Sequence, residues 1–114
     1  MKFTTSLFHG AFLIALSGEL DAVSVRQLEP LITSLPGEHQ VILLDLSEVS
    51  FIDSTGIGAL VFLYKRLQNE LCYLRLICGD GQPRDLLMLL RINKSIPCLQ
   101  KLDEYLLPTG TDAP

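Results

Sequence analysis

The residues with the clearest capacity for chemistry stand at positions 53–58, which read DSTGIG. They follow an apolar run and open a predicted helix, where the first backbone amides lack partners and carry the positive end of the helix dipole. The hydroxyl of Ser54 could cap these amides, and a phosphate at the same place would be stabilised by them. The sequence therefore indicates either a plain helix cap or a phosphate site at Ser54.

Small and acidic residues surround Ser54 in the predicted fold. Gly56 and Gly58 remove side-chain bulk from the first turn of the helix, so a second molecule could approach the backbone closely. Because the carboxyl ends of parallel strands form one rim, Asp21 and Asp53 are expected to converge there. The alternative is that the glycines only permit packing of the helix on the sheet.

Several catalytic patterns are missing from the sequence. There is no G-x-x-x-x-G-K-[ST] segment, and Gly56-Ile57-Gly58 lacks the third glycine of a dinucleotide-binding motif. His9 and His39 both precede Ser54 in predicted turns, so neither is placed to activate that hydroxyl as a nucleophile. The histidines and cysteines match no metal-ligand spacing. We therefore expect no enzyme activity, no metal and no cofactor.

The amino-acid composition narrows the possible classes of protein and partner further. The chain has 114 residues, is 48% hydrophobic and 19% charged, and carries a net charge of −4, which predicts one folded domain and argues against nucleic acid as a partner. The charge-free run Ser54 to Tyr64 is too short to cross a bilayer, so no direct membrane insertion is expected. Three cysteines without C-x-x-C spacing favour thiols in a reducing cytoplasm. These are Cys72, Cys78 and Cys98.

Hydrophobic periodicity predicts strands alternating with helices. A two-residue turn at His9-Gly10 should join the first two strands as an antiparallel hairpin, and Ser24 with Gln27 has the spacing of a capping box. The order predicts an α/β fold: a single domain, residues 1–107, with a mostly parallel sheet, an antiparallel N-terminal strand and about four helices, then a disordered tail, residues 108–114. Strands are expected at 2–8, 11–16, 41–46, 71–78 and 96–99, a loop at 17–21, and helices at 24–35, 54–69, from 83 to about 91 and up to 106, with Asn93 as a left-handed cap.

Two motifs give the sequence a family resemblance. Residues 42–60, ILLDLSEVSFIDSTGIGAL, resemble the signature of the STAS domain family, and within it of the bacterial anti-sigma factor antagonists. Residues 16–21, LSGELD, are similar to the family's second motif before the first helix. The resemblance covers about residues 8 to 106. It departs at residues 69–72, where the family usually has a glycine pair, and at 92–94, where it has Thr-Gly-Leu.

The resemblance implies a regulatory protein rather than an enzyme. Ser54 would accept phosphate from ATP through a partner serine protein kinase that is also the anti-sigma factor, with Thr55 as a second candidate. The unphosphorylated form would bind this kinase and release the sigma factor, and a PP2C-type phosphatase would reverse the modification. The partner-binding residues implied are Asp21, Asp53, Ser54, Thr55, Gly56, Ile57 and Gly58.

Two alternatives remain open at this stage. The first is a cytoplasmic STAS subunit of a phospholipid-trafficking ABC transporter complex, which would dock through the same helix start without phosphorylation. The second concerns the apolar stretch Leu86 to Leu90, which exceeds one helical stripe. It belongs either to the core and its loop cover or to a surface for a partner or for self-association.

Overall fold

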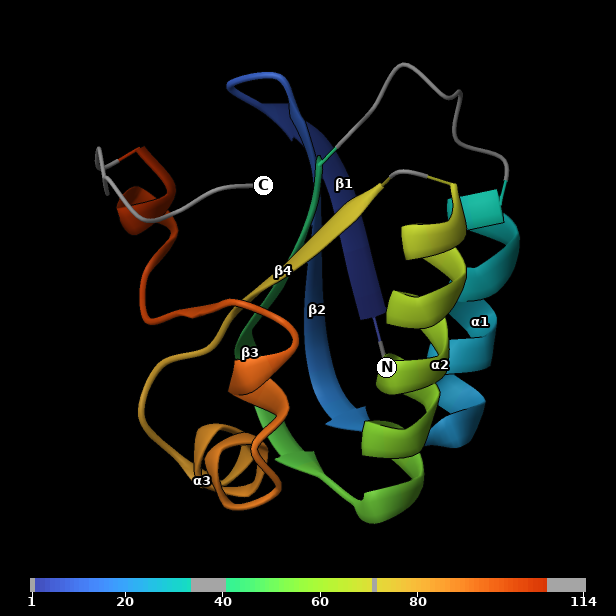
Figure 1. Ribbon diagram of the computed structural model, residues 1–114. Helices are drawn as coiled ribbons and strands as arrows, with labels where there is room; N and C mark the ends of the chain where they lie inside the picture. Colours follow the sequence, from blue (N-terminus) through green and yellow to red (C-terminus); the bar gives the residue numbers. More distant parts are fainter. Residues whose placement is uncertain (1, 34–40, 71, 107–114) are drawn as a thin grey trace.

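The computed structural model describes residues 2–33, 41–70 and 72–106. Five strands and three α-helices alternate in the order that the sequence predicts, and short 3-10 turns lie near the carboxyl end (Figure 1). The last two residues of the helix predicted at 24–35, His39 and the tail 108–114 lie outside the described residues. The elements are β1 Lys2–Phe8, β2 Ala11–Leu20, α1 Ala22–Thr33, β3 Val41–Ile52, α2 Ser54–Asn69, β4 Tyr73–Ile77, α3 Gln82–Leu89, η1 Ile92–Lys94, β5 Cys98–Leu99 and η2 Leu102–Leu106.

The strands lie in the sheet in their chain order, β1-β2-β3-β4-β5. β1 pairs antiparallel with β2, and every later pair is parallel. The predicted α/β class, the mixed sheet and the N-terminal hairpin are therefore confirmed. The last of the four predicted helices is instead the 3-10 turn η2, so the described chain has three α-helices.

Two strands are longer than predicted. β2 continues through residues 17–20, which the sequence predicts as a loop, because register shifts after Ala15 and Gly18 absorb the irregular residues. Gly18 has a φ of 105°, a conformation that glycine adopts without steric cost. β3 continues to Ile52, beside Leu20 of β2. The two strands therefore end together.

The residue after α3 that adopts the left-handed conformation is Arg91, not Asn93. Leu90 caps the helix, and Arg91 follows with φ 59° and ψ 28°, while Asn93 lies in the 3-10 turn η1. The left-handed position comes directly after the last helical hydrogen bonds, so the end of the helix and not the residue preference decides where it falls. The prediction for Asn93 was therefore wrong by two positions.

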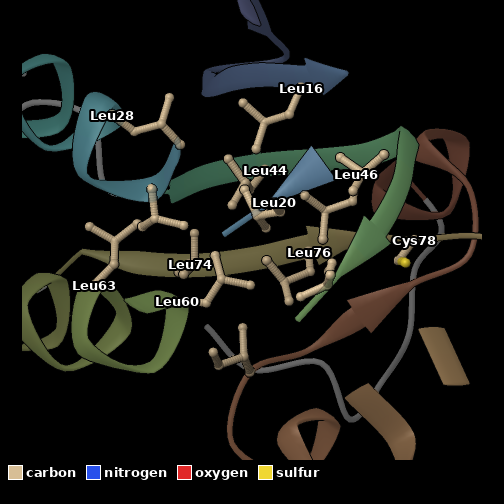
Figure 2. Packing of buried hydrophobic residues seen from close by; sticks show 14 of the residues in the cluster. Leu16, Leu20, Leu28, Leu44, Leu46, Leu60, Leu63, Leu74, Leu76 and Cys78 are labelled. Carbon is tan, nitrogen blue, oxygen red and sulfur yellow. The ribbon is translucent and has the colours of Figure 1, made fainter. Parts of the chain in front are cut away.

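The main core lies between the sheet and the helices. It joins leucines of β2, β3 and β4 to Leu60 and Leu63 of α2 and Leu28 of α1, all at most 2% exposed (Figure 2). A smaller cluster of Ala11, Leu43 and Ile77 covers the opposite face, packed against residues of η2. β3 is thus covered on both sides, as its continuous apolar run predicts.

The apolar stretch in α3 divides between core and surface. Leu87 is fully buried in the main core, whereas Leu89 is 77% exposed and Leu90 is also exposed. The core therefore explains only part of this stretch, and Leu89 and Leu90 form a surface apolar pair.

Among the described residues, the three cysteines form no disulfide. Cys72 and Cys78 stand just outside the two ends of β4, and Cys98 lies on the neighbouring strand β5. Burial raises the pKa of all three, that of Cys98 to about 11, so the protonated thiol is favoured. Among the described residues, no helix is long and apolar enough to cross a membrane.

Candidate functional site

The candidate site forms where β2 and β3 end side by side. Leu20 pairs with Ile52 at the last position of the parallel ladder, and the Asp53 N–H donates to the Leu20 carbonyl at 3.4 Å. Each strand then passes directly into a helix, with Asp21 before α1 and Asp53 before α2. The structure therefore brings the two predicted acidic residues to one rim of the sheet.

Each of these aspartates caps the helix that follows it. Asp53 Oδ1 accepts the Gly56 N–H and the Thr55 hydroxyl, both at 2.7 Å. Asp21 Oδ1 accepts the backbone N–H and the hydroxyl of Ser24, at 2.8 and 2.9 Å. The predicted caps were therefore wrong: Ser54 is the first residue of α2, and Ser24 lies inside α1 as a hydrogen-bond donor.

The capping bonds also set the charge of the two carboxyls. The Ser24 N–H and hydroxyl lower the pKa of Asp21, and the Thr55 hydroxyl and the Gly56 N–H lower the pKa of Asp53. Electrostatic repulsion from Asp21 raises the pKa of Asp53 and so opposes this lowering, which shows that the two carboxylates interact. Both carboxyls are negative at neutral pH, as an ordinary Asp is, and the lowered pKa keeps them negative further into the acidic range.

Ser54 has a free hydroxyl at this rim, whereas Thr55 does not. Ser54 is exposed, and among the residues that the structure describes its hydroxyl has no hydrogen-bond partner. The Thr55 hydroxyl is held by Asp53. Of the two neighbouring hydroxyls, Ser54 is thus the one presented to solvent at the positive end of α2.

The two glycines that follow have different roles. A Cβ on Gly56 would overlap the Leu20 carbonyl oxygen, and it would lie 3.0 Å from the Leu20 carbonyl carbon and 3.3 Å from the Asp21 Cα. The backbone that packs closely against Gly56 is therefore that of the protein's own β2–α1 junction. A Cβ on Gly58 meets nothing within 4 Å, so only Gly58 leaves open space beside Ser54.

The predicted partner-binding residues on α2 differ in how far their side chains are buried. Ile57 is 5% exposed and belongs to the main core, so direct contact of its side chain with a partner does not fit its position. Ser54, Gly58 and Phe62 are exposed at helical spacing along α2, and Phe62 is 60% exposed. Sequence analysis missed Phe62, although an aromatic residue outside the apolar stripe of the helix is the signal that identifies it.

A second residue missed from sequence, Gln82, holds the end of β3. Its Oε1 accepts the Ile52 N–H at 2.9 Å, and its Nε2 donates to the Ile52 carbonyl at 2.8 Å. The carboxamide thereby occupies the place of a neighbouring strand and ties α3 to the residue before Asp53. Only tertiary contact reveals this function, because Gln82 is 30 residues away from Ile52 in the chain.

The arrangement has the chemical groups that covalent modification and docking need. The site offers an exposed hydroxyl, helix amides able to stabilise an attached phosphate, and an acidic and aromatic surface around them. Among the described groups, none hydrogen-bonds to the Ser54 hydroxyl in the manner of a general base.

Comparison with known proteins gives one family match. The model of the STAS domain matches residues 3–105. No curated protein sequence matches the chain.

Solved structures share the fold at low sequence identity. An anti-sigma factor antagonist from Mycobacterium paratuberculosis is 22% identical, covers 92% of this chain and 90% of its own, and has a TM-score of 0.77. The Bacillus cell fate determinant SpoIIAA in its phosphorylated form is 20% identical over 92% of this chain and 96% of its own, with a TM-score of 0.67. A sulfate transporter family protein from Wolinella succinogenes is 16% identical over 87% and 84%, with a TM-score of 0.75. The chain is similar to all three in fold.

Substitution of the two glycines should have opposite effects on stability. Gly56→Ala places a methyl group against the backbone of Leu20 and should lower the free energy of unfolding by about 1–3 kcal/mol. Gly58→Ala is the matched control, because it fills open space in a helix and should raise the same free energy by about 0.5–1 kcal/mol. Urea denaturation followed by circular dichroism measures both. Equal effects of the two variants would contradict the assigned contacts.

The capping carboxylates should make stability depend on acidic pH. Their pKa values are lower in the folded protein than in the unfolded chain, so their stabilisation is complete above the unfolded value of about 4 and is lost as the pH falls through the folded values. Asp21→Asn and Asp53→Asn keep a capping oxygen that cannot titrate, and each should flatten the decline in unfolding free energy between neutral and acidic pH. Denaturation midpoints measured across this range test the effect. An unchanged slope in both variants would refute it.

Proposed function

Because the chain belongs to the STAS domain family, we propose that it is an anti-sigma factor antagonist switched by phosphorylation of Ser54. The unphosphorylated protein binds a partner-switching serine kinase that is also the anti-sigma factor, and thereby releases the sigma factor. A PP2C-type phosphatase restores the unphosphorylated form. The protein acts in the cytoplasm by binding and not by catalysis. The observation that carries the proposal is the exposed Ser54 hydroxyl at the start of α2.

Hydrogen bonding supports Ser54 over Thr55 as the phosphate acceptor. A kinase must reach the hydroxyl and remove its proton, and the Thr55 hydroxyl already donates its proton to Asp53 at 2.7 Å. Modification of Thr55 would also remove a bond of the α2 cap. Modification of Ser54 leaves both cap bonds in place, so the phosphorylated protein keeps its fold.

The charges around Ser54 support a switch in partner affinity. A phosphoserine adds about −1.5 to −2 charges at pH 7, beside a rim that already carries Asp21 and Asp53. The first amides of α2 stabilise part of this charge within the protein. A partner surface that fits the unmodified rim must then accept both a bulky group and stronger negative potential. Phosphorylation therefore weakens the complex without unfolding the antagonist.

The surface next to Ser54 is suited to docking. Phe62 lies two helical turns along the same side of α2, with the open space at Gly58 between them. Exposed aromatic side chains are frequent anchors in protein interfaces. Phe62 is therefore the apolar contact that we assign to the kinase, and Ser54 lies at the acidic end of the same surface.

Phosphorylation should occur at Ser54 and depend on its hydroxyl. Incubation with the cognate kinase and ATP should add one phosphate, and peptide mass spectrometry should place it on Ser54. Ser54→Ala should abolish the modification while unfolding like the wild type, since Asp53 and not Ser54 provides the cap. Thr55→Val is the matched control and should still be modified. Phosphate on Thr55, or an unmodified protein that binds a transporter ATPase instead, would contradict the proposal.

A negative charge at position 54 should weaken kinase binding. Ser54→Asp should lower the affinity by about 1–3 kcal/mol, which is about 5–150-fold, and the phosphorylated protein should lose more because phosphate is larger and more highly charged. Isothermal titration calorimetry compares the wild type, Ser54→Asp and the neutral Ser54→Asn. Equal affinities for Ser54→Asp and Ser54→Asn would show that charge at this position is not the switch.

A further inference from the structure

The first strand forms one edge of the sheet. β1 is the terminal strand, and in the described part of the chain it pairs only with β2. Its residues 2–7 are exposed, including the large apolar side chains of Phe3 at 40% and Leu7 at 66%. Proteins usually protect such an edge with prolines, several charges or bulges. β1 has one charge, at Lys2, no proline and an unbroken register with β2.

The turn into β2 decides which backbone groups face the open edge. His9 and Gly10 have φ values of 48° and 86°, as in the two-residue turn in which the flanking pair, Phe8 and Ala11, exchanges both hydrogen bonds. Antiparallel pairs alternate between hydrogen-bonded and non-hydrogen-bonded positions. Residues 8, 6, 4 and 2 therefore bond to β2, and the N–H and C=O groups of Phe3, Thr5 and Leu7 point to the open edge.

This edge is complementary to itself. Two copies of β1 related by a two-fold axis at Thr5 place residue i opposite residue 10 − i, so the three outward-facing residues meet one another in hydrogen-bonded pairs. Side chains of matching kinds then face each other across the axis, and such cross-strand pairs stabilise a sheet. The pairs are Phe3 with Leu7, Thr4 with Ser6, Thr5 with Thr5, and Lys2 with Phe8 of the second copy.

We infer that β1 is a homodimer interface, in which two chains join edge to edge into one ten-stranded sheet with Thr5 on the two-fold axis. The charges agree with a second copy as the occupant, because the register brings no two like charges opposite each other and sets the single cation, Lys2, against an aromatic ring. A seven-residue edge is about 24 Å long, which is a small interface, so the dimer is reversible and depends on concentration.

Charge substitutions at the axis test this register directly. Thr5→Lys and Thr5→Glu each place like charges opposite one another in the homodimer, and each should weaken association about tenfold or more. An equimolar mixture of the two variants places opposite charges together and should restore association, as a heterodimer. The side chain of residue 5 is exposed in the single chain, so both variants should unfold like the wild type.

Sedimentation equilibrium from micromolar to millimolar concentration, in reducing buffer, measures the result. The wild type should approach twice its chain mass of 12.6 kDa, and Leu89→Lys on the exposed end of α3 is the control that should dimerise normally. A wild type that stays monomeric throughout would overturn the inference. A dimer lost in Leu89→Lys but kept in both Thr5 variants would also overturn it, because it would place the interface on α3.

Discussion

The close approach of Gly56 to the end of β2 is the contact on which the site depends. It sets the first turn of α2 directly against the backbone of Leu20 and Asp21, where any larger residue would meet a carbonyl group. The contact joins Leu20 and Gly56, which belong to different sequence motifs and stand 36 positions apart in the chain, and it brings the two capping aspartates to one rim. The position of Ser54 follows from it, because Ser54 lies between the cap and this glycine at the start of the helix.

The two aspartates have a structural and an electrostatic role at the same time. Each stabilises the start of a helix by accepting backbone and side-chain hydrogen bonds, and those bonds lower the pKa of each carboxyl, so that it stays ionised to a lower pH than an ordinary Asp. The negative rim is therefore a consequence of how the helices begin. A phosphate at Ser54 meets this rim and the helix amides together, which allows a small modification to change the surface while the core stays as it is.

The connection that follows each strand determines how well the sheet is covered at that strand. The strands β2 to β5 follow one another in parallel, so each return of the chain needs a helix or a turn to cross over, and these elements cover the sheet. β1 returns by a two-residue hairpin instead and brings no covering helix with it. Its exposed apolar side chains and open backbone groups are the direct result of that connection.

Local sequence pattern determined most of the architecture of this protein. The alternation of apolar runs and helical stripes predicted the α/β order, the His9-Gly10 turn predicted the antiparallel hairpin, and the DSTGIG segment predicted an exposed serine at a helix start. These features depend on residues close together in the chain. Asp21 and Asp53 are far apart in the chain, yet they could be expected to meet, because each follows a predicted parallel strand and the carboxyl ends of parallel strands form one rim.

Tertiary structure decided the features that depend on distant residues. Gly18 looks like a loop residue in the sequence, yet bulges opposite β3 keep it within β2. The local sequence cannot distinguish Gly56 from Gly58, because only packing determines what a Cβ would meet. Gly56 faces the protein's own backbone, and Gly58 faces open space. The exposure of Phe62 on α2 is settled in the same way, because the orientation of a helix on the sheet is fixed by the sum of its core contacts and not by any one residue.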